Sequence, residues 1–194
     1  MGQDDRADFK PAATGPRRTM QCLSPPDLRN RLYRAGWGLV WLTLFRPSPV
    51  PLHAWRRLLL RLFGAVVEND TAIYPSARIW APNRLVMRRG SCLAAQTDCY
   101  NVALVELAAD CVVSQKAYLC TASHDFDDPV FPLIGAPISV GAGAWVAAAA
   151  FVGPGVHIGE RAVVAATATV TRNVDPAAVV AGNPARVVRH RIGA

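Results

Sequence analysis

The chain lacks the cysteine pattern of a disulfide-stabilised protein. Its five cysteines are an odd number, and no two of them form a CxxC pair. Cys99 and Cys111 fall on inward positions of a repeat described below, where a thiol acts as a small apolar side chain. This usage favours a reducing compartment over a disulfide framework, so we expect a cytoplasmic protein.

The first residues lack the apolar core of a signal peptide, and the segment that follows them lacks an apolar run long enough for a membrane span. Residues 1–22 have no apolar core, and we expect a flexible tail. Residues 23–66 are apolar and basic, and they predict two helices, over 28–45 and 52–63, separated by prolines. The longest uncharged run of this segment, 35–45, has eleven residues, whereas a span needs about twenty.

Acidic residues are scarce, with 14 against 21 basic ones and a formal net charge of +7. The arginines gather between Arg17 and Arg61 and near the C-terminus, which suits a nucleic acid, a membrane surface or a polyphosphate ligand. No aromatic residues interleave with basic ones as a stacking platform, so we expect no nucleic-acid partner. A hydrophobic content of 52% excludes global disorder.

What the sequence does contain is a repeat of six residues. An aliphatic side chain returns at every sixth position, and a small or β-branched residue follows four positions later. The aliphatic positions are Val140, Val146, Val152, Ile158, Val164 and Val170. Neither the period of a helix nor that of an ordinary strand fits this spacing. The repeat is typical of a parallel β-helix, in which each hexad forms one face of a triangular coil.

The same phase continues towards the N-terminus. Three earlier series begin at Ile73, Met87 and Leu107, and they are separated by shifts of about two residues near Leu85 and Val105 that predict β-bulges. We therefore predict an all-β parallel β-helix over residues 67–175 and a short cap over 176–194.

Two roles are open for the apolar and basic segment 23–66. The open strand edges at the end of a coil must be covered, which favours an end cap. Trp37, Trp41 and Trp55 stand beside arginines, which favours a peripheral contact with the inner face of a membrane. The two roles are compatible.

The repeat is interrupted after His124 and resumes at Ile138, so residues 125–137 are predicted to form a loop. A histidine on the last coil residue before such an excursion is held by a rigid wall and screened by the loop. That position suits a general base, because imidazole exchanges protons near neutral pH. An ordinary surface histidine is the alternative. Asp125 either orients His124 or is a solvated acid.

Five segments of the chain resemble one enzyme family. They are FRPSPVPLHAWRRLLLRLFGA, IYPSARIWAP, VVSQKAYLCTASHDFDDPVFPLI, FVGPGVHIGE and VVAGNPARVV. They are similar to the hexapeptide-repeat acyltransferases, and within them to the colanic acid biosynthesis acetyltransferases of bacterial polysaccharide operons. The ASHD and AGNPA stretches carry the specificity, because other proteins share the repeat. The resemblance implies a left-handed coil, whereas general crossover rules favour a right-handed one.

The resemblance also implies roles for individual residues. His124 would take the proton from a sugar hydroxyl as its oxygen attacks the thioester of acetyl-CoA, and the backbone N–H of Ala148 would meet the oxyanion. Trp145 would pack beside the thioester arm. The other family positions, along the pantetheine groove or at the phosphates, are Ala166, Thr171, Arg172, Arg186 and Arg189. Residues 176–194 would thus contribute to CoA binding.

The acceptor site is weakly marked. Asp98 and Asn101 lie on a predicted outward wall one coil below His124, where they would either bind sugar hydroxyls or be ordinary exposed residues. A carbonic anhydrase with this repeat needs three zinc-binding histidines, but only His157 accompanies His124 on the coil. We therefore expect no metal.

The resemblance implies an O-acetyltransferase that moves acetyl from acetyl-CoA to a sugar hydroxyl of an exopolysaccharide precursor. It also implies a homotrimer with active sites between subunits, and flat coil walls with exposed apolar residues favour the same assembly. N-acetylation of an amino sugar is one alternative. A non-catalytic scaffold is another, which the presence of both ASHD and AGNPAR disfavours.

Overall fold

The computed structural model of the 194-residue chain describes residues 20–23 and 27–192. Most of the predicted tail, residues 1–19, lies outside the described residues. The last two residues of that predicted tail form strand β1 (Gln21–Cys22), which pairs antiparallel with β12 (Leu133–Gly135). The boundary predicted at residue 22 is therefore wrong, because these two residues belong to a small sheet.

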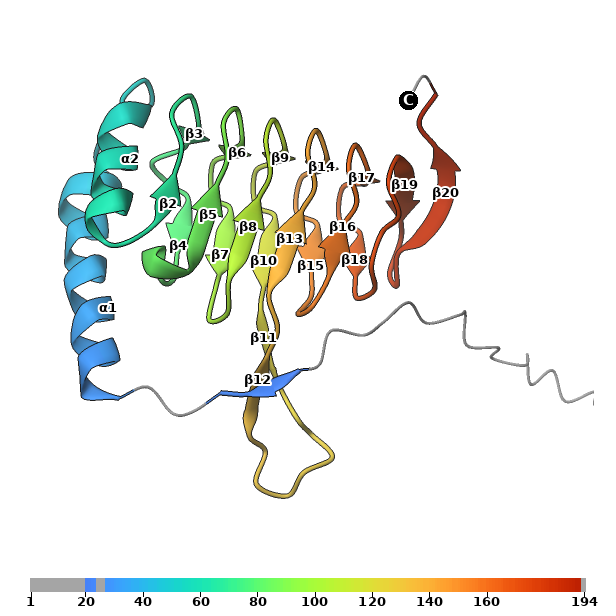
Figure 1. The fold of residues 1–194 in the computed structure, drawn as a ribbon, viewed down its shortest axis with the longest axis horizontal. Coiled ribbons are helices and arrows are strands. Elements are labelled where there is room, and N and C mark those ends of the chain that lie inside the picture. Colours follow the sequence, from blue (N-terminus) through green and yellow to red (C-terminus); the bar gives the residue numbers. More distant parts are fainter. Residues whose placement is uncertain (1–19, 24–26, 193–194) are drawn as a thin grey trace, which may run out of the picture.

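The main body is a parallel β-helix with three flat faces (Figure 1). The β2 sheet consists of β2 (Val66–Val67), β5 (Leu85–Met87), β8 (Val105–Leu107), β13 (Ile138–Val140) and β16 (His157–Ile158). The β3 sheet consists of β3 (Ala72–Ile73), β6 (Cys92–Leu93), β9 (Val112–Val113), β14 (Trp145–Val146), β17 (Val163–Val164), β19 (Ala178–Ala181) and β20 (Arg186–His190). The β4 sheet consists of β4 (Arg78–Ile79), β7 (Asp98–Tyr100), β10 (Tyr118–Cys120), β15 (Phe151–Val152) and β18 (Thr169–Val170). The predicted β-helix is confirmed.

The aliphatic residues of the hexads fill the interior of the coil. Val113, Val146 and Val164 lie side by side in parallel register, and all three are fully buried. At the corners the chain turns through a left-handed residue such as Ala149, with φ 55°. Gly159 is required because a Cβ there would lie 2.4 Å from a backbone nitrogen of the following turn. The six-residue repeat thus reflects one inward packing position, which recurs on each face of every turn.

At each of the two shifts in the repeat, the coil has a corner with more residues than its other corners. The predicted bulges near Leu85 and Val105 are wrong, because the parallel register of β2, β5 and β8 is unbroken. The additional residues lie between the β4 and β2 sheets, where the 3₁₀ helix η2 (Pro82–Arg84) occupies the first of these corners. The side-chain amide of Asn101 holds this corner: its oxygen accepts from Ala81 N at 2.9 Å, and its nitrogen donates to Ala81 O at 2.7 Å and Arg84 O at 3.0 Å.

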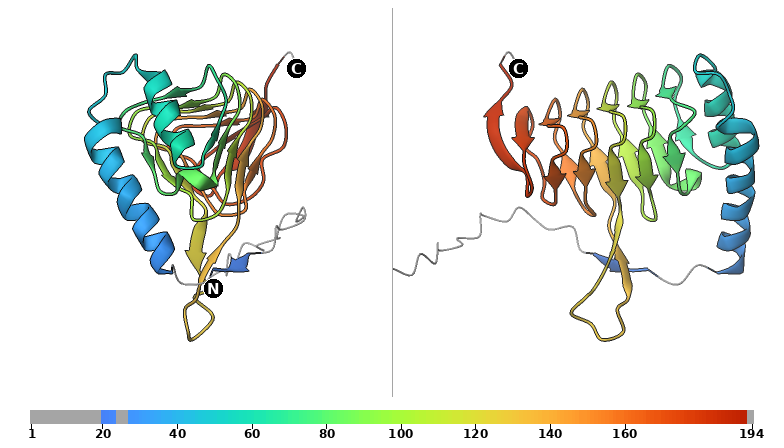
Figure 2. Two further views of the ribbon diagram at one scale, coloured as in Figure 1. Left: turned by 60° about the vertical axis from the view of Figure 1, so that its left-hand side comes forward. Right: turned by 180° about the vertical axis from the view of Figure 1, so that it is seen from behind.

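The predicted helical extension is confirmed, and it covers the N-terminal end of the coil (Figures 1 and 2). It consists of α1 (Leu28–Val40), a π-helical turn η1 (Trp41–Phe45) and α2 (His53–Leu62). Trp37, Phe45, Leu59 and Leu60 are buried in the same apolar core as the first coil. In the part of the chain that the structure describes, no helix is long and apolar enough to cross a membrane.

The repeat is interrupted by a hairpin that projects from the coil, which we call the arm. Strands β11 (Ala122–His124) and β12 pair antiparallel and project from the corner that follows β10 (Figure 1). His124 lies opposite Leu133 in this hairpin. The predicted loop 125–137 therefore contains a strand, and β1 extends the arm to a small three-stranded sheet.

Candidate active site

His124 lies at the end of β11, in the arm rather than on the coil wall where the sequence placed it. The wall position is wrong because the chain leaves the coil after β10 and makes the arm's antiparallel pairs before it reaches the histidine. The imidazole is exposed, its Nδ1 lies 3.0 Å from the carbonyl oxygen of Phe131, and the two rings stack at 4.3 Å with an interplanar angle of 7°. The arm thus holds the ring in one orientation.

The hydrogen bond of His124 defines which nitrogen is available for chemistry. A carbonyl oxygen accepts hydrogen bonds and cannot donate, so Nδ1 must carry the hydrogen in this contact. In a neutral imidazole the other nitrogen, Nε2, then keeps its lone pair. This is the form in which a histidine accepts a proton from a hydroxyl group.

Asp125 does not orient His124, so that prediction is corrected. Its carboxylate accepts a hydrogen bond from the backbone N–H of Asp127 at 3.2 Å, and its own N–H donates to Pro132 O at 3.1 Å. Short-range bonds of this kind are what aspartates make in turns. Asp125 shapes the tip of the arm.

Phe131 is the residue that sequence reasoning missed. It supplies both the carbonyl and the ring that hold His124, and it has a positive φ of 49°. A bulky residue in this backbone region is strained, and such strain is concentrated at functional sites. The sequence shows only a phenylalanine in a proline-rich loop, and nothing in the repeat marks it.

Three of the residues proposed for CoA share the outer face of the β3 sheet. Trp145 lies opposite Val163, Val163 opposite Val179, and Val179 opposite Arg189, so Trp145 and Arg189 occupy one row. Arg186 pairs with Ala181, which is two residues after Val179 in the same strand, and it therefore points to the same side of the sheet. Trp145 is 47% exposed on this face. The structure thus brings an exposed indole and two guanidinium groups together along one wall.

Ala148 and Ala166 lie on successive turns at the corner between the β3 and β4 sheets. Within the described ranges the backbone N–H of Ala148 makes no hydrogen bond, which leaves it free as a donor. Thr171 and Arg172 lie at a different corner, after β18, which is the corner from which the arm projects two turns earlier, after β10. His124 and Ala148 are therefore at separate corners of a single chain.

The two residues proposed for the acceptor differ in their exposure. Asn101 is fully buried and its amide is used by the corner at η2, so its predicted outward position is wrong. Asp98 does lie on the outer face of the β4 sheet, between Arg78 and Tyr118 in register. Burial raises the pKa of the Asp98 carboxyl, and the charge of Arg78 partly opposes that shift.

No group of three or more histidine, cysteine or acidic side chains converges to hold a metal ion in the described part of the molecule. His157 is occupied on the coil, where its Nδ1 lies 2.7 Å from the hydroxyl of Ser139.

No protein-family model matches the chain. It is 38% identical over 156 residues to "Putative colanic acid biosynthesis acetyltransferase WcaF" of Escherichia coli (strain K12), which covers 80% of this chain and 86% of that protein. Its fold is similar to that of a maltose O-acetyltransferase from Clostridium difficile 630, with a TM-score of 0.77 at 21% identity, covering 86% of this chain and 90% of the other. A hexapeptide-repeat acetyltransferase from Vibrio cholerae, solved with acetyl coenzyme A, gives a TM-score of 0.74 at 24% identity, with coverage of 84% and 90%.

The fold and the site thus define an acyltransferase built on hexapeptide repeats. The chain belongs to the hexapeptide-repeat acetyltransferases. The predicted acetyl-CoA-dependent acyltransferase class is confirmed at the level of this family, and a purely structural scaffold is not its function.

Proposed function

We propose that the protein is an O-acetyltransferase that moves acetyl from acetyl-CoA to a hydroxyl of a sugar in an exopolysaccharide precursor. The observation that carries this proposal is the orientation of His124, whose Nε2 is left free by the bond between Nδ1 and Phe131. The identity to a relative named for colanic acid biosynthesis, over most of both chains, supports the class of acceptor.

In the proposed reaction, His124 Nε2 takes the proton of the acceptor hydroxyl as its oxygen attacks the thioester carbonyl. The C–O bond forms, the C–S bond breaks, and the proton passes to the departing sulfur of CoA. Negative charge builds on the thioester oxygen in between, and the free N–H of Ala148 is the proposed donor to it. A backbone donor needs no particular side chain, so alanine suffices at this position.

The proposed active site requires more than one copy of the chain. His124 is on the arm at one corner, whereas Trp145 and Ala148 border the outer face of the β3 sheet. That face carries exposed apolar side chains, with Val112 37% and Trp145 47% exposed. We therefore propose a homotrimer in which the arm of one subunit meets the CoA wall of its neighbour.

For CoA binding, we expect Arg186→Ala or Arg189→Ala to raise the KM for acetyl-CoA by about tenfold or more, with little change in kcat. Phosphate contacts are remote from the thioester, so they bind the ground state and the transition state about equally. Arg191→Ala is the matched control, because its guanidinium already donates to Arg161 O at 3.2 Å. A decrease in kcat alone in the first two variants would contradict the assignment.

We also propose that residues 23–66 hold the enzyme at the inner face of a membrane. Exposed apolar side chains form one stripe on α1 and η1, on the side opposite the buried Trp37, and a second stripe on α2. They are Leu28, Leu32, Leu39 and Leu42 in the first stripe, and Trp55, Leu58 and Leu62 in the second. Between residues 28 and 67 the sequence has seven arginines and no acid, which complements anionic lipid headgroups.

The membrane proposal predicts that the full chain sediments with phosphatidylglycerol vesicles and less with phosphatidylcholine vesicles, and that salt weakens the binding. Leu32→Asn with Leu39→Asn is expected to abolish sedimentation at unchanged thermal stability, while Leu104→Asn, an exposed leucine on the coil, has no effect. Equal sedimentation of all three proteins would overturn it. A change in oligomer size of the double variant would assign the stripe to contact between subunits instead.

The acceptor class is tested by the release of CoA thiol with a panel of neutral sugars, amino sugars and polysaccharide precursors, followed by identification of the ester or amide formed. An ester on a sugar hydroxyl is the expected product. An amide on an amino sugar would favour N-acetylation in place of the proposed reaction.

A further inference from the structure

A groove runs between α1 and the first two coils. Its larger part, with a volume of about 510 Å³, is lined by Arg31, Arg34, Ala35, Trp37, Gly38, Trp41, Arg78, Ile79 and Trp80. Its smaller part, about 390 Å³, is lined by Leu23, Asn30, Arg34, Trp80, Ala81, Arg84, Tyr100, Val102 and Leu133. The two parts share Arg34 and Trp80 in their linings and are therefore adjacent. We call the whole the arginine groove.

The aromatic wall of the arginine groove is rigid. Trp37 and Trp41 donate their indole N–H groups to the carbonyls of Ile79 at 2.7 Å and Ala77 at 2.9 Å. The ring of Trp80, which follows β4, lies 5.0 Å from the ring of Tyr100 in β7. The indole N–H groups of Trp37 and Trp41 are thus satisfied by the coil, and these fixed rings border the groove.

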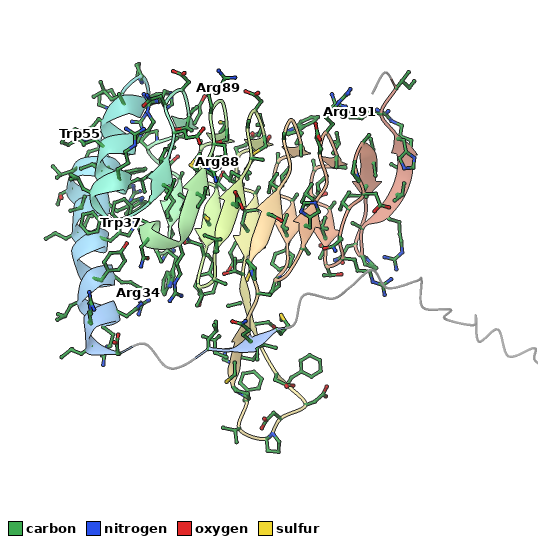
Figure 3. All side chains as sticks on the ribbon, in the orientation of Figure 1. Arg34, Trp37, Trp55, Arg88, Arg89 and Arg191 are labelled. Carbon is green, nitrogen blue, oxygen red and sulfur yellow. The ribbon has the colours of Figure 1, made fainter. Side chains whose placement is uncertain are left out.

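In the described part of the chain no salt bridge joins a carboxylate to a cation of the arginine groove, although Asp98 lies in register beside Arg78. Arg34 lies over the ring of Trp80, with its guanidinium carbon 4.5 Å from the centroid, and it points from α1 towards the coil (Figure 3). Arg31 and Arg78 are exposed, and none of the lining residues is acidic. The ion pairs of Arg88 with Glu68 and Glu106 lie outside the groove. Like charges gathered in one groove repel, and a bound anion would offset that cost.

The arginine groove ends beside the candidate catalytic residue. Leu133, which lines the smaller part, lies directly opposite His124 in the arm. Opposite residues of an antiparallel pair point to the same face, about 5 Å apart. A ligand in the groove would therefore extend from the arginines of α1 to the face of the arm that carries His124.

We propose that the arginine groove binds the phosphate or diphosphate of a glycosyl acceptor, with the sugar directed towards His124. The inference rests on the proposed function. Guanidinium groups bind phosphate oxygens through paired, charge-assisted hydrogen bonds. The rings of Trp80 and Tyr100 line the smaller part of the groove and give it apolar surface beside the cations. The diphosphate belongs either to a nucleotide sugar or to a lipid-linked sugar.

The binding test uses inorganic pyrophosphate as the probe and calorimetry of the full chain in saturating CoA, which keeps the CoA site filled. Arg31→Gln with Arg78→Gln is expected to raise the Kd about tenfold or more for each charge-assisted bond lost. Both side chains are exposed, so the fold should tolerate the change. Arg29→Gln with Arg89→Gln removes the same charge outside the groove and should leave the Kd unchanged. Absence of binding to the wild type, or equal weakening in both double variants, would overturn the proposal.

The activity test compares galactose, UDP-galactose and undecaprenyl-diphosphate galactose as acceptors. The groove variant is expected to lower kcat/KM for the diphosphate acceptors relative to galactose by about tenfold or more, and the control variant to keep the wild-type ratio. The diphosphate acceptor with the higher kcat/KM identifies the source. If the groove variant kept the wild-type ratio of kcat/KM values while turnover still depended on His124, the role of the groove would be excluded and the proposed function would stand. If pyrophosphate binding required Arg31 and Arg78 but no acceptor were acetylated, the groove would stand as an anion site and the proposed function would be excluded.

Discussion

Replacement of His124 by alanine is expected to lower the turnover number by a factor of about 10² to 10⁴, which is the contribution of a positioned general base. The affinity for CoA should stay near that of the wild type, because the imidazole is on the arm and the proposed CoA wall is on the β3 sheet. The measurement is thiol release from acetyl-CoA at saturating acceptor, combined with CoA titration of each protein.

The matched control for His124 is His157→Ala. His157 is also an exposed histidine on a strand, but its Nδ1 is bonded to Ser139 and it belongs to the β2 sheet of the coil rather than to the arm. Its replacement should leave turnover unchanged. Near-normal turnover in the His124 variant would exclude this residue as the base, and equal losses in both variants would indicate a general effect on the coil.

Replacement of Arg56 by alanine is expected to lower the free energy of unfolding by roughly 3 kcal/mol or more. Arg56 belongs to α2, and its side chain is fully buried between the helical extension and the first coil. Its guanidinium donates to Ile73 O at 2.6 Å, to the Ser48 hydroxyl at 2.7 Å, to Pro49 O at 2.8 Å and to Val50 O. Burial lowers the pKa of this group, which still stays charged near neutral pH. Truncation would leave several buried acceptors without a donor.

Arg57→Ala serves as the control for Arg56, since it is the next residue of the same helix and makes one bond, to Thr71 O at 2.8 Å. We expect it to cost about 1 kcal/mol. Urea unfolding of the three proteins compares these costs. If both variants lost the same small amount, the helical extension would contribute little to covering the coil.

A part of this fold is predictable from the sequence when the interactions that form it are local or recur with the repeat. The inward positions of the hexads are predictable because each must fill the same space in every turn, so the requirement recurs in the sequence. The corner at Asn101 is not, because its amide bonds to Ala81 and Arg84, about one turn of the coil away in the chain. A two-residue shift in the repeat is the same in the sequence whether it makes a bulge or a longer corner.

The candidate site divides in the same way. The interruption of the repeat after His124 is visible in the sequence, because a coil cannot omit its inward residues without leaving the wall. The tautomer and orientation of that histidine depend on Phe131, which comes back to it only through the pairing of β11 with β12. Asp125, its chain neighbour, turns to Asp127 instead.

The sequence by itself determined the β-helix, the two N-terminal helices and the position of the histidine at the break, because each of these depends on local composition or on a period. The tertiary structure decided which groups meet: Phe131 with His124, Asn101 with the corner at η2, and the arginines of α1 with the aromatic rings of the coil. These contacts join residues that have no periodic relation to one another. Only the folded chain brings them within hydrogen-bonding or stacking distance.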